Sequence, residues 1–166
     1  MGHQFMVDMT LGKLARWLRI LGFDTVAVRE GSDRDLTDRQ NRLFLSRNRG
    51  LLAKLRGQSH LLLRSHGVAG QMRELFTALQ ITSTDLPGTP RCSLCNMELI
   101  RIERRAVRPF VPDYVACHAA RFGRCPQCGR IYWPGTHQRR MGLFMEQVFP
   151  HGTSHNADLG SLRCGF

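Results

Sequence analysis

Two pairs of cysteines with the spacing Cys-x-x-Cys constrain this chain more than any other feature. The first pair is Cys92 and Cys95, the second is Cys125 and Cys128, and 29 residues separate the pairs. This spacing lets one tight turn present two thiolates to one ion, and two such turns complete a tetrahedral zinc shell. A closed four-sulfur shell leaves no open coordination position, so we predict a structural Zn²⁺ ion.

Redox-active pairs and disulfide bonds are the alternatives for these cysteines. Neither pair follows a strand and opens a helix as in thioredoxin, and the N-terminus does not resemble a secretory signal. The other two thiols, Cys117 and Cys164, are interpreted as a buried thiol and a tail thiol. Reduced zinc thiolates favour a cytoplasmic location, with an organelle matrix as the alternative.

The cysteine pairs lie in the second half of the chain, which predicts two folded units. We expect a first domain at residues 1–86, a linker at 87–90 and a zinc ribbon with a closing helix at 91–149. The tail at 150–166 has few large apolar side chains and is expected to be extended.

Strands alternate with helices before the linker. Apolar runs predict strands at residues 5–8, 25–28, 43–46 and 60–64. Helical spacing or capping residues predict helices at 11–21, 32–40 and 72–79. This alternation predicts an α/β fold with a mostly parallel sheet flanked by helices.

The positive charge of the chain comes almost entirely from arginine. The formal net charge is +11, and the 24 basic residues include only two lysines, Lys13 and Lys54. Guanidinium groups bind phosphates in a bidentate manner and stack on bases, so we predict a nucleic-acid partner. The alternative is an ordinary solvated surface, on which a GC-rich genome encodes arginine in place of lysine. No apolar stretch approaches the roughly 20 residues that a membrane span needs, so no membrane partner is expected.

Polar side chains follow the predicted strands. Asp8 ends the first strand, Asp33 and Asp35 open the helix after the second, and Asn48 follows the third. In a parallel sheet these positions meet at the carboxyl edge, where oxygen ligands suit Mg²⁺ or Mn²⁺. The alternative is that these carboxylates are helix caps.

Several blocks of the chain are similar to one protein family. The longest is FMVDMTLGKLARWLRILGFD at residues 5–24, and the next is CPQCGRIYWPGTH at 125–137. Shorter blocks follow in the family's order at residues 33–36, 45–52, 71–75 and 91–96. On these blocks the chain resembles the Mut7-C RNase domain family.

The resemblance implies a PIN-like nuclease domain followed by a zinc ribbon, and metal-dependent hydrolysis of RNA. It places the catalytic positions at Asp8, Asp33, Asp35 and Asn48, with the three carboxylates holding Mg²⁺ or Mn²⁺. The candidates to hold the RNA backbone are Lys13, Arg16, Arg19, Arg47 and Arg49.

The chain departs from the family at the third strand, where Ser46-Arg47-Asn48 replaces Thr-Arg-Asp. An amide in place of a carboxylate removes one negative charge and is a poorer Mg²⁺ ligand. Two hypotheses follow. The protein is an endoribonuclease attenuated by Asn48, or it is a catalytically inactive RNA-binding module bound to structured RNA in a ribonucleoprotein such as a ribosome.

Overall fold

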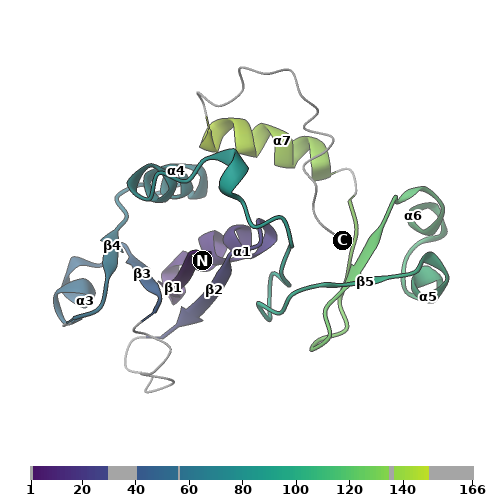
Figure 1. Cartoon of the computed structure of the whole chain (residues 1–166), viewed down its shortest axis with the longest axis horizontal. Helices are drawn as coiled ribbons and strands as arrows, with labels where there is room; N and C mark the ends of the chain where they lie inside the picture. Colours follow the sequence, from purple (N-terminus) through teal and green to yellow (C-terminus); the bar gives the residue numbers. More distant parts are fainter. Residues whose placement is uncertain (1, 30–40, 56, 135–136, 150–166) are drawn as a thin grey trace.

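The computed structural model describes residues 2–29, 41–55, 57–134 and 137–149. The predicted helix at 32–40, with Asp33 and Asp35, lies outside the described residues, and so does the tail with Cys164. The described part contains a parallel sheet with helices and a smaller antiparallel sheet, which lie at opposite ends of the molecule in Figure 1.

The larger sheet has four strands. They are β1 (Gln4–Asp8), β2 (Asp24–Val28), β3 (Leu43–Ser46) and β4 (His60–Leu62). Their order across the sheet is β2-β1-β3-β4, and every neighbouring pair is parallel. The predicted α/β fold with a parallel sheet flanked by helices is therefore confirmed.

The two faces of this sheet are covered by different helices, because side chains alternate along each strand. Phe5 and Val7 point into the main core, which α1 (Gly12–Ile20) and α4 (Val68–Ala78) supply with leucine, methionine and phenylalanine side chains. Met6 points to the opposite face, where it packs with Phe44 and with Leu52 of the short helix α3 (Arg49–Ala53).

The last helix, α7 (His137–Val148), packs against α4 and α1 (Figure 1). The rings of Phe144 and Trp17 stack with centroids 3.8 Å apart, and Val148 belongs to the main core. The predicted division grouped this helix with the cysteine unit. Its side chains pack into the main core beside α1 and α4, so the last described helix lies against the first.

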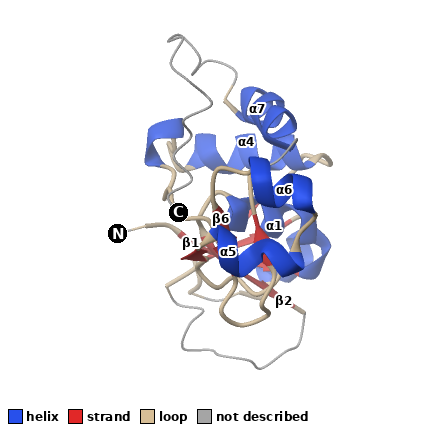
Figure 2. Ribbon diagram, turned by 90° about the vertical axis from the view of Figure 1, so that its right-hand side faces the viewer, coloured by secondary structure: helices blue, strands red, loops and turns tan. Residues whose placement is uncertain are grey.

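The smaller sheet has the order β5-β6-β7 and is antiparallel. Its strands are β5 (Ile100–Ile102), β6 (Phe122–Arg124) and β7 (Ile131–Tyr132). Two short helices, α5 (Arg104–Val107) and α6 (Asp113–His118), connect β5 to β6. Figure 2 shows them together on the face turned to the viewer. Val107, Ala116 and Phe122 are buried in a small separate core beneath them.

The linker between the units passes closely over Gly22, the residue that ends α1 and turns the chain toward β2. Gly22 has φ +99°, and a Cβ atom there would lie 2.7 Å from the carbonyl oxygen of Thr89. Only glycine adopts this backbone conformation without strain and leaves room for the linker. None of the described helices is both long and apolar enough to cross a membrane.

Candidate metal centre and nucleic-acid interface

The four predicted zinc ligands come together between the two units. The Sγ atoms of Cys92, Cys95, Cys125 and Cys128 all lie within 4.8 Å of one another. A tetrahedral zinc ion with Zn–S bonds of about 2.3 Å holds its sulfurs about 3.8 Å apart. The distance between the Sγ atoms of Cys92 and Cys128 is 3.7 Å. The donor set and its spacing therefore fit Zn²⁺ and are compatible with a zinc ribbon.

The two cysteine turns have matching backbones. Asn96 follows the first pair with φ 64°, and Gly129 follows the second with φ 71°. The amide of Asn96 donates to the carbonyl oxygen of Cys92 at 2.9 Å, and the amide of Gly129 donates to that of Cys125 at 3.0 Å. Each left-handed residue closes a tight turn that aims two sulfurs at one point.

The thiols of this cluster are not equivalent. Burial raises the pKa of Cys92, but the Tyr132 hydroxyl at 3.1 Å and the amides of Cys95 and Leu94 outweigh burial and lower this pKa to about 6. The contact with Cys128 and the loss of solvation raise the pKa of Cys95 to about 12. The pKa of Cys92 therefore lies below that of Cys95, and the Tyr132 hydroxyl contacts the cluster directly.

Arg19 links the first cysteine turn to the parallel sheet. Its guanidinium donates to the carbonyl oxygen of Thr25 at 2.8 Å and to those of Ser93 and Leu94 at 2.9 and 3.0 Å. Burial lowers the pKa of Arg19, while the nearby Cys92 thiol raises it. The sequence predicts an RNA contact for Arg19. In the structure the residue is only 8% exposed, and its guanidinium donates to protein carbonyl oxygens.

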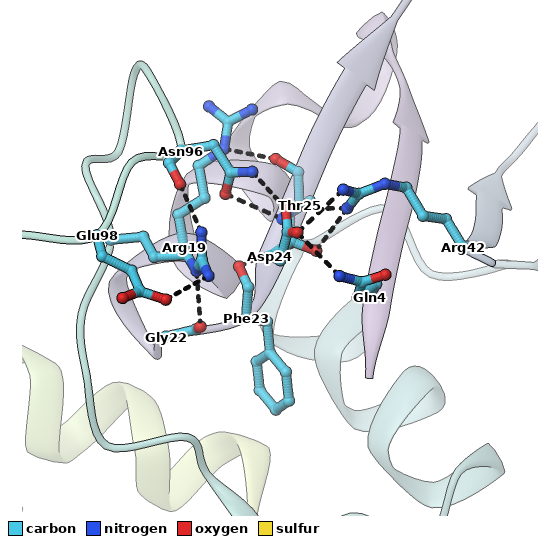
Figure 3. A network of polar contacts seen from close by, with 10 residues as sticks. Gln4, Arg19, Gly22, Phe23, Asp24, Thr25, Arg42, Asn96 and Glu98 are labelled. Carbon is cyan, nitrogen blue, oxygen red and sulfur yellow. Dashed lines mark hydrogen bonds and ion pairs between the residues drawn. The ribbon is translucent and has the colours of Figure 1, made fainter. Parts of the chain in front are cut away.

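A polar network extends this junction along the edge of β2 (Figure 3). The side-chain oxygen of Asn96 accepts from the Thr25 amide at 3.0 Å, and its Nδ2 donates to Asp24. Asp24 forms an ion pair with Arg42 at 2.9 Å. Arg91 donates to the carbonyl oxygen of Gly22 at 3.2 Å. Arg19 and Asn96 thus provide hydrogen-bond partners for the backbone carbonyl and amide of Thr25, which an edge strand otherwise leaves unpaired.

Asp8 and Asn48 meet at the opposite, carboxyl edge of the sheet. The side chain of Asp8 is buried and accepts hydrogen bonds from the Thr10 amide at 2.8 Å, from the Thr10 hydroxyl and from the Ser46 hydroxyl. The same Ser46 oxygen accepts from the Asn48 amide at 2.9 Å. This edge lies between β1 and β3, where the strand order reverses and parallel sheets bind ligands.

Both residues also cap short helices. Asp8 is the N-cap of a turn of 3₁₀ helix at Met9–Leu11, and the side-chain oxygen of Asn48 accepts from the Leu51 amide at 3.2 Å as the N-cap of α3. The alternative that these polar side chains are helix caps therefore holds in the structure for Asp8 and Asn48. A carboxylate has about four lone-pair sites, so the three hydrogen bonds to Asp8 leave room for one further ligand.

A basic pocket of about 340 Å³ lies beside this edge, at the ends of β3 and β4. It is lined by Arg47, Arg49 and Arg64, with Leu62 and Leu63 as its apolar part. Arg47 approaches Nδ1 of His66 at 2.8 Å. Sequence analysis missed Arg64, although its position after the fourth strand was a usable signal. Lys13 and Arg16 are exposed one turn apart on α1.

Within the described ranges, the four cysteines are the only group of three or more cysteine, histidine or acidic side chains spaced to hold a metal ion. The predicted Mg²⁺ or Mn²⁺ site requires Asp33 and Asp35, which lie outside these ranges, so it remains a prediction.

The fold and the cysteine cluster together define a class of protein, an α/β domain with a parallel sheet that carries a four-cysteine metal-binding unit. A family model described as the Mut7-C RNAse domain matches residues 3–145. The chain belongs to this family, as its sequence blocks predicted. No curated protein and no solved structure matches the chain.

Proposed function

We propose that the protein binds RNA at the carboxyl edge of a PIN-like domain, residues 1–86, and hydrolyses its phosphodiester bonds slowly. The observation that carries this proposal is the position of Asp8, linked through Ser46 to Asn48, beside a pocket lined by three arginines. Membership of an RNase domain family supports RNA as the substrate. The cysteine unit that precedes α7 is then a zinc ribbon whose ion is structural.

In this proposal Asp8, Asp33 and Asp35 would hold Mg²⁺ or Mn²⁺, and the bound ion would supply activation of water and neutralisation of phosphate charge. Arg47, Arg49 and Arg64 hold the RNA phosphates at the pocket. The Ser46 hydroxyl fixes the orientation of the Asp8 carboxylate and holds the Asn48 backbone in the same arrangement. The amide and the hydroxyl of Thr10 donate to the other oxygen of the Asp8 carboxylate.

Asn48 is the reason to expect slow turnover. It supplies no negative charge, and its side-chain oxygen is already engaged by the Leu51 amide. Loss of one carboxylate from a three- or four-carboxylate site weakens divalent-ion binding. The N-cap contact that Asn48 makes is also open to aspartate, so restoring the acidic residue costs the fold little.

The second candidate function is a catalytically inactive RNA-binding module in a ribonucleoprotein such as a ribosome. The specific observation in its favour is that Asp8 and Asn48 both serve as helix caps, which explains their presence without catalysis. This candidate shares the arginine pocket with the first, so RNA binding alone does not separate them.

Cleavage of labelled structured RNA by the zinc-loaded protein with Mn²⁺ tests the two candidates. Asp8→Asn keeps one acceptor oxygen for the cap contact with Thr10 but removes the charge, and Asn48→Asp restores the missing carboxylate. Cleavage by the wild type that Asp8→Asn abolishes and Asn48→Asp increases supports the nuclease. Intact RNA with all three proteins, each of which still binds, supports the inactive module.

A further inference from the structure

The segment between the two cysteine pairs carries a surface that the proposed active site does not use. We call its helical part, residues 103–121, the ribbon insert; it contains α5 and α6. Residues 96–124 include six arginines against three acidic residues. Figure 1 places α5 and α6 at the end of the molecule away from the parallel sheet, so this charge is separate from the pocket at β3 and β4.

Most of this positive charge has no partner among the residues that the structure describes. Arg101, Arg105 and Arg108 are exposed, and none forms a hydrogen bond or an ion pair with any described residue. The arginines at the junction differ, because Arg19 donates to three carbonyl oxygens and Arg91 forms an ion pair with Glu98. The guanidinium groups of the insert are therefore available to an anionic ligand.

A pocket of about 490 Å³ opens where the insert joins its sheet. It is lined by Arg101, Arg104 and Arg121 together with Ile102, Glu103, Ala120 and Phe122. Arg104 is held by a hydrogen bond to the carbonyl oxygen of Ala119 at 3.0 Å, while Arg101 and Arg121 have no such bond within the described part of the chain. Arginine side chains next to apolar ones suit a ligand that carries a phosphate and an attached sugar or base.

Two aromatic rings of the insert face solvent. Phe110 is 70% exposed and Tyr114 is 71% exposed, and the Tyr114 ring stacks on His118 with centroids 4.2 Å apart. The small core beneath does not include either ring; its buried members are Val107, Val111, Ala116, Ala119 and Phe122. Large apolar rings that contribute nothing to the core mark a binding surface.

We propose that the ribbon insert binds an unpaired segment of RNA, with Arg105 and Arg108 on phosphates and with Tyr114 and Phe110 stacked on bases. The proposal rests on RNA as the partner of the proposed function, but not on cleavage. Exposed planar rings among arginines favour unpaired RNA, whose bases are free to stack, over a duplex or an acidic peptide.

Binding of fluorescent single-stranded oligouridylate to the full chain tests this proposal. The zinc-loaded protein carries Asp8→Asn, and no Mg²⁺ or Mn²⁺ is added, so that binding is measured without cleavage. Arg105→Gln with Arg108→Gln removes two charges from the insert. Thr77→Glu with Ala78→Glu changes the net charge equally at exposed positions of α4 and serves as the matched control.

We expect the arginine double variant to bind roughly tenfold more weakly at 0.1 M salt, and its dependence of log K on log salt to be shallower by about 1.4. The control keeps the wild-type slope. Tyr114→Ser should weaken binding at least about fivefold, while Tyr114→Phe, which keeps the ring, should not. Duplex RNA should lose little affinity from Tyr114→Ser.

Equal loss in the arginine variant and its control, or equal binding by Tyr114→Ser and Tyr114→Phe, overturns the proposal and redirects the search to an acidic protein partner. Photocross-linking of thiouridine RNA to the protein without insert substitutions gives a second measurement. Cross-linked peptides from residues 103–121 support the proposal, and cross-links confined to residues 43–66 overturn it. Failure of the proposed nuclease appears separately, as intact RNA in the cleavage assay with Mn²⁺, and leaves the binding results unchanged.

Discussion

Asn96 and Asp24, which are 72 residues apart, are joined by a hydrogen bond of 2.5 Å between Asn96 Nδ2 and Asp24 Oδ1. Asn96 closes the first cysteine turn, and Asp24 opens β2. Because the other side-chain atom of Asn96 accepts from the Thr25 amide, this one residue joins the metal centre to the edge of the parallel sheet. A change in the conformation of the cysteine turn therefore alters the hydrogen bonds at the amino end of β2.

Asn96→Gly and Asn96→Ala separate the two roles of this residue. Both remove two hydrogen bonds, at about 1 kcal/mol each. Alanine adds the strain of a left-handed backbone, about 1–2 kcal/mol, which glycine avoids. We expect the free energy of unfolding to fall by about 2 kcal/mol in Asn96→Gly and further in Asn96→Ala, as measured by urea denaturation. Equal losses would show that the backbone conformation at Asn96 carries no cost.

Asp24→Asn should destabilise the protein at neutral pH. The side chain of Arg42 is 8% exposed and that of Asp24 is 18% exposed, so the substitution removes an ion pair that is largely shielded from solvent. We expect a loss of about 2–3 kcal/mol, at or below the lower end of the range for fully buried pairs.

The same substitution should flatten the dependence of stability on pH. Burial raises the pKa of Asp24, but hydrogen bonds from Arg42 and Asn96 outweigh burial and leave this pKa below its ordinary value. A depressed pKa in the folded state contributes stability above the unfolded value of about 3.9, and that stability is lost as the pH falls through the folded pKa. The difference in urea midpoint between the wild type and Asp24→Asn should therefore shrink below about pH 4. A difference that stays constant from pH 7 to pH 3 would contradict this origin.

Gly22→Ala should cost about 2 kcal/mol or more. The new Cβ atom would lie 2.7 Å from the carbonyl oxygen of Thr89, at a backbone conformation that L-residues rarely adopt. Gly12→Ala is the matched control, because Gly12 has helical dihedrals and no atom within 4 Å of its added Cβ. The control should be neutral or stabilising by about 0.5 kcal/mol. Thermal unfolding of both variants checks the prediction, which fails if they behave alike.

Removal of zinc should increase local unfolding of β2 as well as of the small sheet. Cys125→Ser, at a buried ligand position, should abolish binding of one zinc ion per chain. The interpretation of Cys117 as a buried thiol is wrong, since this residue is exposed and outside the cluster, and Cys117→Ser should retain the ion. The Thr25 amide donates to Asn96, so its hydrogen exchange should rise several-fold in Cys125→Ser and remain slow in Cys117→Ser. Unchanged protection of Thr25 would show that the cysteine turn keeps its shape without the metal.

Phe144→Ala should release α7 from the first unit. The stacked pair with Trp17 is half-buried, so we expect a loss of about 2 kcal/mol, smaller than for a fully buried ring. Leu143→Ala, at a neighbouring position that is 52% exposed, should cost far less. With Trp133→Phe as background, the remaining fluorescence reports Trp17 and should shift to the red in Phe144→Ala only. A shift of the same size in Leu143→Ala would contradict the role of the stack.

The parallel sheet could be predicted because each of its strands is a short apolar run bounded by turn residues. The helices α5 and α6 could not, since elements of four and six residues are too short to show a helical period. The four cysteines were predicted because their local spacing already defines a ligand set. The burial of Arg19 was not, because its partners are carbonyl oxygens up to 75 residues away, which no side-chain pattern marks.

The return of α7 to the first unit makes the cysteine unit an insertion that is tethered at both ends. Between α4 and α7 the chain runs through residues 79–136, and the cluster joins this segment internally at Cys92 and Cys128. A bound metal would shorten the loop that α7 must close from roughly 60 to roughly 20 residues, which favours docking of the helix by about 1 kcal/mol. Zinc would thus strengthen a helix that it never touches, through the entropy of the connecting chain alone.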